Sequence, residues 1–230
     1  MTTFEFTCYD VRRIFPLFTI YKMETITNMT GLLKLAKQIE ACTRCGLHQT
    51  RNNTVPGEGD PNADIVLIGE GPGANEDRLG RPFVGQAGVV LNGLLESIGL
   101  QRKDVFITNM VKCRPPNNRD PLPVEISACR YFLDAQLKDI DPKVLVTLGR
   151  HALVNFFPGE SIGKARGKPR LWNKYVIYPI YHPAAALHNP KLRLILKDDF
   201  TNLSSIVNSV AKAKPAREAA TMHSRQLNLF

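Results

Sequence analysis

Residues 65–88, "IVLIGEGPGANEDRLGRPFVGQAG", are the stretch that decides the fold. The stretch opens with four consecutive aliphatic residues, which is typical of a strand that is covered on both faces. Six glycines punctuate the rest of it. A glycine-rich loop directly after such a strand is typical of open α/β sheets, which bind ligands beyond the carboxyl ends of their strands.

Three further runs, "DVFITNMV", "KVLVTLG" and "YVIYPIYH", resemble the first, because they are nearly continuously apolar and rich in Val, Ile and Tyr. Helical patterns of apolar residues lie between or around these four runs. The helical patterns cover residues 30–42, 86–99, 123–140 and 192–213. Strands that alternate with helices predict an α/β domain with a mainly parallel sheet.

The composition favours a soluble DNA- or RNA-binding protein. Lys and Arg outnumber Asp and Glu by 30 to 21, which gives a net charge of +9 and favours a polyanionic partner. No apolar run is long enough to span a membrane, so we expect a cytoplasmic, nucleoid-associated protein. We expect an N-terminal extension outside the native domain (1–28), a globular domain (29–210) and a flexible basic tail (211–230).

Three polar residues follow the carboxyl ends of predicted strands. Glu70 follows the first strand, Asn109 lies near the end of the second and His182 ends the fourth. Because the carboxyl ends of parallel strands meet at one edge of a sheet, we expect these residues to share a site.

The glycine-rich loop does not fit a phosphate-binding loop. Pro72 lacks a backbone N–H, and Glu70, Glu76 and Asp77 would repel a phosphate. The Gly-Lys-Ser/Thr ending of a P-loop is absent from the loop sequence. A small, neutral, polar ligand fits better, with Phe83 as an aromatic face for it.

Four cysteines could form a metal site. Cys42 and Cys45 form a C-x-x-C pair at the end of a predicted helix, while Cys113 follows a strand and Cys129 lies in a helix. Four thiolates can bind zinc or an iron–sulfur cluster, and the spacing does not choose between them.

Several motifs together resemble the family 4 uracil-DNA glycosylases. They are "VPGEGDPNADIVLIGEGPGANEDRLGRPFVGQAG", "ITNMVKCRPPNNRDP" and "YHPAAAL", in this order along the chain. The resemblance implies a three-layer α/β/α sandwich around a four-stranded parallel sheet. It implies hydrolysis of the N-glycosidic bond of deoxyuridine in DNA, which leaves an abasic site. It also implies a [4Fe–4S] cluster on Cys42, Cys45, Cys113 and Cys129.

The resemblance assigns roles around a flipped uracil. Asn109 corresponds to the residue that reads the uracil edge, and we expect other groups to lock its amide in one orientation. Glu76 corresponds to a residue near C5, where it excludes the methyl group of thymine. Phe83 is expected to stack on the base.

The remaining site residues are assigned from the chemistry. His182 is expected to donate a hydrogen bond to O2 of uracil as negative charge develops there. The backbone N–H of Gly71 is a second donor. Glu70 is the candidate to bind the attacking water or the uracil edge, because this family has Gly71 where better-known uracil glycosylases carry an aspartate base.

DNA contacts are expected around the same edge of the sheet. Leu187 is the candidate wedge that fills the space left by the base. The candidate phosphate contacts are Lys112, Arg114, Arg119 and Arg193. Since no covalent step is expected, the enzyme should turn over, and we expect a monomer.

The C-terminal "RQLNLF" resembles the motif by which bacterial proteins bind the DNA sliding clamp. Gln226 would hydrogen-bond to the clamp, while Leu227, Leu229 and Phe230 would fill an apolar groove. The alternative is that this apolar end docks on its own domain.

Two other classes of function remain open from the sequence. A non-catalytic nucleic-acid-binding module with a zinc site would explain the charge and the cysteines, but not the Glu, Asn and His at one sheet edge. A redox iron–sulfur protein would not require the clamp-like C-terminus.

Overall fold

The computed structural model describes the backbone of residues 29–227 and the side chains of residues 29–210. The predicted N-terminal extension therefore lies outside the described residues. The same holds for Leu229 and Phe230 and for the side chains of Gln226 and Leu227, so the clamp motif remains a prediction.

A six-stranded sheet with the order β1-β3-β2-β4-β6-β5 forms the centre of the fold. The strands are β1 (Glu58–Gly59), β2 (Ile65–Gly69), β3 (Phe106–Asn109), β4 (Val144–Leu148), β5 (Arg170–Trp172) and β6 (Tyr175–Ile180). The four central strands pair in parallel, in agreement with the predicted four-stranded parallel sheet. The antiparallel edge strands β1 and β5 were not predicted, because two or three residues are too short to give a hydrophobic pattern.

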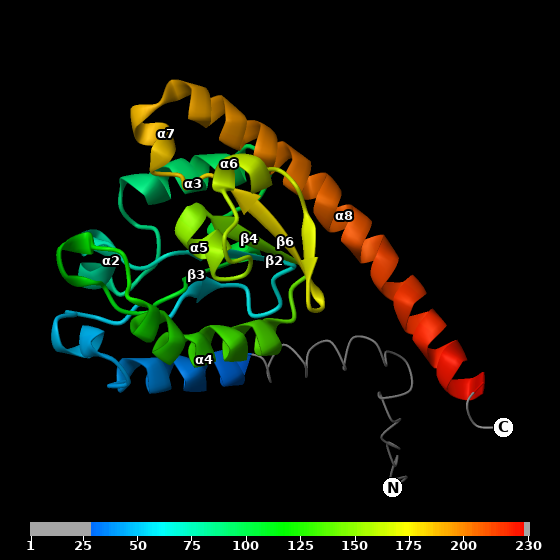
Figure 1. The fold of residues 1–230 in the computed structure, drawn as a ribbon, viewed down its shortest axis with the longest axis horizontal. Coiled ribbons are helices and arrows are strands. Elements are labelled where there is room, and N and C mark those ends of the chain that lie inside the picture. Colours follow the sequence, from blue (N-terminus) through cyan, green and yellow to red (C-terminus); the bar gives the residue numbers. More distant parts are fainter. Residues whose placement is uncertain (1–28, 228–230) are drawn as a thin grey trace, which may run out of the picture.

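Alternate residues of the central strands fill two separate cores. In β2, Ile65 and Leu67 face one core, while Val66 and Ile68 face the other. Helices α3 (Gln86–Glu96) and α8 (Pro190–Leu227) cover the first face, and α4 (Pro123–Ile140) and α5 (Arg150–Val154) cover the second (Figure 1). The predicted three-layer α/β/α sandwich is thus confirmed.

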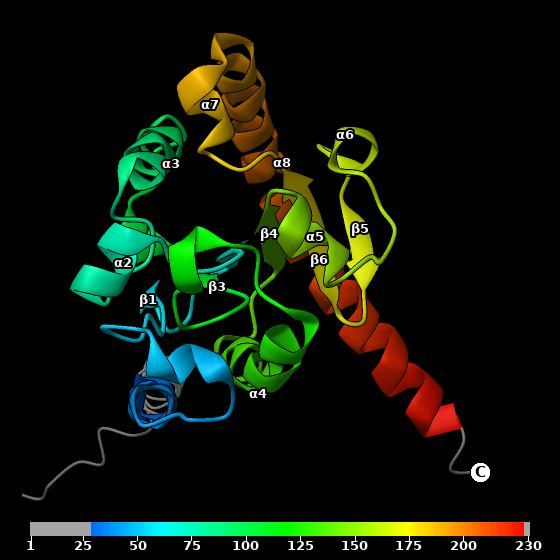
Figure 2. The ribbon, with the colours of Figure 1, turned by 60° about the vertical axis from the view of Figure 1, so that its left-hand side comes forward.

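Shorter helices complete the connections between these layers. They are α2 (Ala74–Leu79), α6 (Ile162–Ala165), α7 (Ala185–His188), and the 3₁₀ turns η2 (Gly46–Gln49), η3 (Arg102–Asp104) and η4 (Pro116–Asn118). A helix over residues 29–40 lies beside α4, as both ribbon views show (Figures 1 and 2). Its Leu35 and Ile39 pack with Phe132 of α4 in a third core, which also contains Cys113 and Cys129.

Helix α8 continues to Leu227, and its last turns extend away from the sheet (Figure 1). The flexible basic tail over residues 211–230 remains a prediction. Residues 211–220, "AKAKPAREAA", combine the strong helix formers alanine, lysine, arginine and glutamate with Pro215, which lacks the N–H for a helical hydrogen bond. Among the described residues, no helix is long and apolar enough to cross a membrane.

Candidate active site

The carboxyl ends of the parallel strands converge on one pocket. Gly69 of β2 pairs with Asn109 of β3, so Glu70 and Asn109 lie at the same edge, and His182 follows the end of β6. All three residues line a pocket of about 430 Å³. The pocket also contains Gly71, Glu76 and Phe83, so the six residues predicted to bind the base meet at one place.

Two glycines of the loop permit this close packing. A Cβ on Gly69 would lie 2.7 Å from Cζ of Phe83 and would also collide with Oδ1 of Asn109. A Cβ on Gly71 would lie 2.8 Å from Cγ2 of Val111. Both distances are well inside van der Waals contact, so any side chain at these positions would displace the walls of the pocket.

The Phe83 loop is held from two sides. Glu76 Oε1 accepts hydrogen bonds from the backbone N–H groups of Val84 and Gly85, each at 2.9 Å. Arg102 Nη1 donates to the carbonyl oxygen of Phe83 at 3.0 Å. The ring of Phe83 is 6% exposed, and its backbone has φ of +50°, a left-handed conformation that a phenylalanine rarely adopts. These contacts fix a strained turn that places an aromatic face in the pocket.

Asn109 presents a free amide to the pocket. The residue is 2% exposed, and its backbone carbonyl accepts a hydrogen bond from Lys112 Nζ at 2.8 Å. The expected hydrogen-bonded lock on its amide is not found among residues 29–210. Packing of Oδ1 over the Cα of Gly69 restricts the side chain instead. An amide that has no protein partner is available to read a ligand.

The imidazole of His182 is a neutral donor. Burial, followed by the nearby His151, lowers the pKa of His182 to about 4, while Glu76 opposes this shift. Nδ1 accepts a hydrogen bond from the backbone N–H of Ala184 at 3.1 Å. Neutral His182 therefore carries its proton on Nε2. The ring also stacks with Phe83, with centroids 5.6 Å apart.

Glu70 lies at the opposite side of the pocket with an unusual carboxyl group. Burial, with a smaller contribution from Asp120, raises the pKa of Glu70 to about 7, while Arg150 opposes the shift. Its Oε1 atom is buried and has no hydrogen-bond partner among the described residues. A carboxyl group whose pKa is about 7 can bind a water molecule and accept a proton from it.

His151, which the sequence motifs did not single out, approaches Glu70 from α5. Its Nδ1 lies 3.6 Å from Glu70 Oε1. His151 is the second residue of α5, just beyond the end of β4. His182 was selected as a polar residue at the carboxyl end of a predicted strand, and the same criterion could have found His151. Gly149 has φ of +88°, and a Cβ on it would lie 2.9 Å from Cβ of His182, which brings the ends of β4 and β6 together.

The four predicted cysteine ligands gather in the third core, around a small cavity that all four line. None of them forms a disulfide. Three of their sulfurs accept N–H groups, as metal-bound thiolates commonly do: Arg44 N donates to Cys42, Arg51 Nη1 to Cys113 and Lys112 N to Cys129. Burial raises the pKa of Cys113 to about 11, so a metal would have to displace its proton.

The predicted phosphate contacts divide into two groups. Lys112 is 1% exposed, and its Nζ donates to Thr108 Oγ1, Asn109 O and Gln136 Oε1. The prediction that Lys112 contacts phosphate is therefore wrong, because its charge is held inside the domain. Arg193 is exposed on α8 and remains a candidate.

The other DNA candidates lie near the pocket. Arg119 lines the pocket and forms two hydrogen bonds to Glu125, at 2.7 and 2.9 Å. Arg114 is half-buried and donates to Asn118 at 2.8 Å. Leu187 lies half-buried in the short helix α7, which follows His182.

Comparisons with known proteins agree with this site. Residues 56–219 match the model of the uracil DNA glycosylase superfamily. A type-4 uracil-DNA glycosylase of Sulfurisphaera tokodaii is 50% identical over 188 residues, which cover 77% of this chain and 86% of that protein. The type-4 protein of Saccharolobus solfataricus is 49% identical, with 79% and 88% covered, and that of Thermotoga maritima is 48% identical, with 75% and 93% covered. By the identity and by the length covered, this chain belongs to the type-4 uracil-DNA glycosylases.

Proposed function

We propose that the chain hydrolyses the N-glycosidic bond of deoxyuridine in DNA, releasing uracil and leaving an abasic site for base excision repair. One observation carries the proposal: an unpaired amide, a neutral histidine donor, a fixed aromatic ring and a carboxyl group line a single pocket. Together these groups can bind a planar base and assist its departure.

Base binding comes first. A uracil inside a duplex must be flipped out, which costs a few kcal/mol that contacts in the pocket offset. Stacking on Phe83 contributes about 1–3 kcal/mol. The Asn109 amide donates to O4 and accepts from N3–H, whereas cytosine presents the reverse pattern to the same orientation.

Thymine is excluded by the wall of the pocket. A hydrophobic wall discriminates one methyl group weakly, so a fixed group must occupy the space beside C5. Glu76 lines the pocket, and its two backbone hydrogen bonds hold the carboxylate rigidly. We assign thymine exclusion to Glu76 for this reason.

The chemical step separates charge between the sugar and the base. The Nε2–H of neutral His182 donates to O2 of uracil as negative charge accumulates there, and the backbone N–H of Gly71 is a second donor. Glu70 binds the water that attacks the sugar carbon and accepts its proton. Because the bond to the base is largely broken before the water attacks, a carboxyl group with a pKa of about 7 is a sufficient base.

The cysteine site fits a [4Fe–4S] cluster held by Cys42, Cys45, Cys113 and Cys129. A single tetrahedral zinc ion would bring the four sulfurs to about 3.8 Å from one another. Among the described residues, no set of three cysteine sulfurs lies within 4.8 Å of one another, which favours the larger cluster. These cysteines would hold the cluster between the segment after the residue 29–40 helix, the segment after β3 and α4. The cluster would have a structural role, since hydrolysis transfers no electron.

Two measurements test these assignments. The protein is incubated with a uracil-containing oligonucleotide or with its thymine-containing counterpart, and alkali then reveals abasic sites. Cleavage of the uracil strand alone is expected; no cleavage of either strand would contradict the function. Anaerobically purified protein should show the visible absorbance of an iron–sulfur cluster, and stoichiometric zinc without that absorbance would contradict the cofactor assignment.

The C-terminal residues 226–230 are proposed to bind the DNA sliding clamp. The motif supports this proposal, and α8, which leads towards it, extends away from the sheet up to Leu227 (Figure 1). Deletion of residues 226–230 should abolish clamp binding and leave excision from a short oligonucleotide unchanged. Unchanged clamp affinity after the deletion would contradict the proposal.

A further inference from the structure

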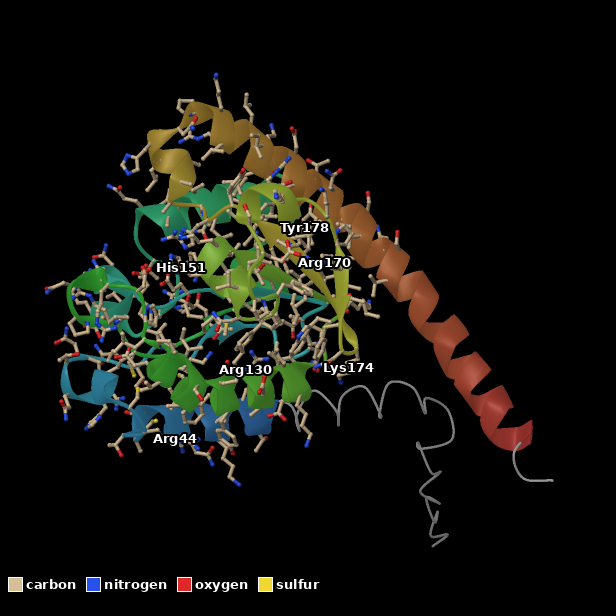
Figure 3. All side chains as sticks on the ribbon, in the orientation of Figure 1. Arg44, Arg130, His151, Arg170, Lys174 and Tyr178 are labelled. Carbon is tan, nitrogen blue, oxygen red and sulfur yellow. The ribbon has the colours of Figure 1, made fainter. Side chains whose placement is uncertain are left out.

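A connected group of charged residues borders Glu70 on the side away from the base. Helix α5 supplies Arg150 and His151, and the loop before α4 supplies Asp120. His151 Nδ1 lies 3.6 Å from Glu70 Oε1, and His151 Nε2 lies 3.5 Å from Asp120 Oδ2. Figure 3 shows His151 beside α5, on the side of the molecule that carries α2.

The hydrogen bonding of Arg150 fixes the tautomer of the His151 ring. Arg150 Nε donates to His151 Nε2 at 2.8 Å, so Nε2 is the nitrogen with the lone pair. Arg150 Nη2 also lies 3.9 Å from Asp120 Oδ2, which places the guanidinium against both groups. The proton of a neutral His151 is therefore on Nδ1, the nitrogen that is closer to Glu70.

We propose that His151 is a positioning residue for Glu70: its Nδ1–H group orients the Glu70 carboxylate toward the attacking water and keeps it ionised. The inference rests on the proposed function, because it takes Glu70 as the group that binds this water. The separation of 3.6 Å is slightly longer than a hydrogen bond, and catalytic hydrogen bonds commonly shorten when the ligand binds.

The surroundings of Glu70 explain why it requires such a donor. Its Oε1 atom is buried without a hydrogen-bond partner among the described residues, and His151 Nδ1 lies 3.6 Å from this atom. Asp120 disfavours the charged form of Glu70, whereas Arg150 favours it. The remaining titratable groups that line the pocket are Glu76, Arg119, which is paired with Glu125, and the neutral His182. Because these opposing charges leave the ionised form of Glu70 weakly stabilised, one additional hydrogen-bond donor would favour that form.

The test is a double-mutant cycle read as a pH profile. Four proteins are compared, the wild type, Glu70→Gln, His151→Leu and the double variant, by single-turnover excision from a uracil oligonucleotide between about pH 5 and about pH 9. The wild-type rate should rise to a plateau with its midpoint near pH 7, because the Glu70 carboxylate forms there. In His151→Leu, which has no side-chain donor, this midpoint should rise by about one pH unit, the effect of losing one hydrogen bond to a charged group.

If the effects of the two substitutions on the rate are not additive, His151 acts by positioning Glu70 and not through a general structural role. Glu70→Gln should lower the plateau about tenfold and remove this pH dependence. Adding His151→Leu to it should change nothing further, since the group on which His151 acts is then absent. His151→Asn, whose side-chain amide N–H lies near the position of Nδ1, should restore most of the wild-type midpoint. Lys143→Gln, which removes a positive charge from the amino end of β4, is the matched control and should leave the profile unchanged.

The outcomes separate the inference from the function beneath it. Rate losses that multiply in the double variant, or a wild-type profile in His151→Leu, would overturn the role of His151 and leave the role of Glu70 intact. Full activity of Glu70→Gln would remove Glu70 from the mechanism and the inference with it. Should His151→Leu not fold, the midpoints of His151→Asn and wild type are compared, and a shift of more than one unit in His151→Asn would contradict a donor role.

Discussion

Individual residues of the pocket are fixed by contacts that sequence spacing does not reveal. Glu76 Oε1 accepts from the backbone of Val84 and Gly85, which lie eight and nine residues further along the chain. The carboxylate therefore serves the loop that carries Phe83 as well as the wall beside the base. His182 is similarly fixed, because Ala184 N donates to its Nδ1.

Replacement of Glu76 should affect stability and specificity together. In Glu76→Ala, two half-buried backbone donors lose their acceptor, so the free energy of unfolding should fall by about 1–3 kcal/mol. The vacated space should also permit measurable excision of thymine. Denaturant unfolding and a thymine oligonucleotide assay measure the two effects. Glu76→Gln retains an acceptor oxygen and is the control; equal stability of Glu76→Ala and wild type would contradict the holding role.

Loss of the donor at His182 should slow the chemical step. His182→Ala should reduce the single-turnover rate about 10²–10³-fold, the usual effect of removing one donor to a developing oxyanion. Asn109→Ala should be similarly impaired, and both should lose more activity than Glu70→Ala. A His182→Ala rate close to that of wild type would exclude the proposed mechanism.

Stability should also depend on pH through His182. Its folded pKa of about 4 lies below the ordinary value of 6.5, so the unfolded chain binds a proton more readily. The stability that neutral His182 contributes is present above about pH 6.5 and is lost as the pH falls towards about 4. Denaturant unfolding should show a smaller decrease across this range for His182→Ala than for wild type. Parallel curves for the two proteins would contradict the shifted pKa.

At the scale of elements, one buried lysine joins the pocket to the cysteine site. Lys112 follows β3, and its Nζ donates to Asn109 O in the pocket and to Gln136 Oε1 in α4. Its backbone N–H donates to Cys129 Sγ at 3.3 Å. The segment between β3 and Cys113 is thereby held against α4, and this fixes the backbone from which Asn109 reads the base.

Removal of this lysine should cost stability and uracil binding. Lys112→Met removes the Nζ donor from buried acceptors on Thr108, Asn109 and Gln136, at about 1–3 kcal/mol for each acceptor left unpaired. Gln136 Oε1 retains a second donor, Thr108 Oγ1. The melting temperature should fall, and KM for the uracil oligonucleotide should rise. Lys103→Met, at an exposed position in η3, is the control. A melting temperature equal to that of wild type would contradict the structural role of Lys112.

For the whole molecule, the net charge of +9 sets how DNA binding responds to salt. Arg193 is exposed near the start of α8, next to the short helix α7 that carries Leu187. Lys174, in contrast, is adjacent to β6 at its amino end and forms an ion pair with Asp141. Because exposed Arg193 lies towards the pocket and Lys174 at the other edge is ion-paired, we expect the edge of the sheet that carries the pocket to face the DNA.

Charge removal on this face should reduce the salt dependence of binding. Arg193→Gln should weaken binding to a thymine-containing duplex and lower the slope of log K against log salt by about one, the change expected for one phosphate contact. Lys174→Gln, at the opposite edge, should leave the slope unchanged. Fluorescence anisotropy over a salt series measures both, and an unaltered slope in Arg193→Gln would exclude the contact.

The sequence by itself determined the layered α/β fold, the shared edge of Glu70, Asn109 and His182, and the family. These features depend on local periodicity and on motifs, which a linear chain displays directly. The tertiary structure alone decided that Lys112 is internal, that His151 faces Glu70 and that the ring nitrogens of His182 have distinct roles. The packing of α4 against the sheet encloses Lys112, and the meeting of two strand ends brings His151 to Glu70 from more than eighty residues away. The turn after β6 places the backbone N–H of Ala184 against His182 Nδ1. The pKa values follow from such burial and contacts, which a pattern of residue types does not display.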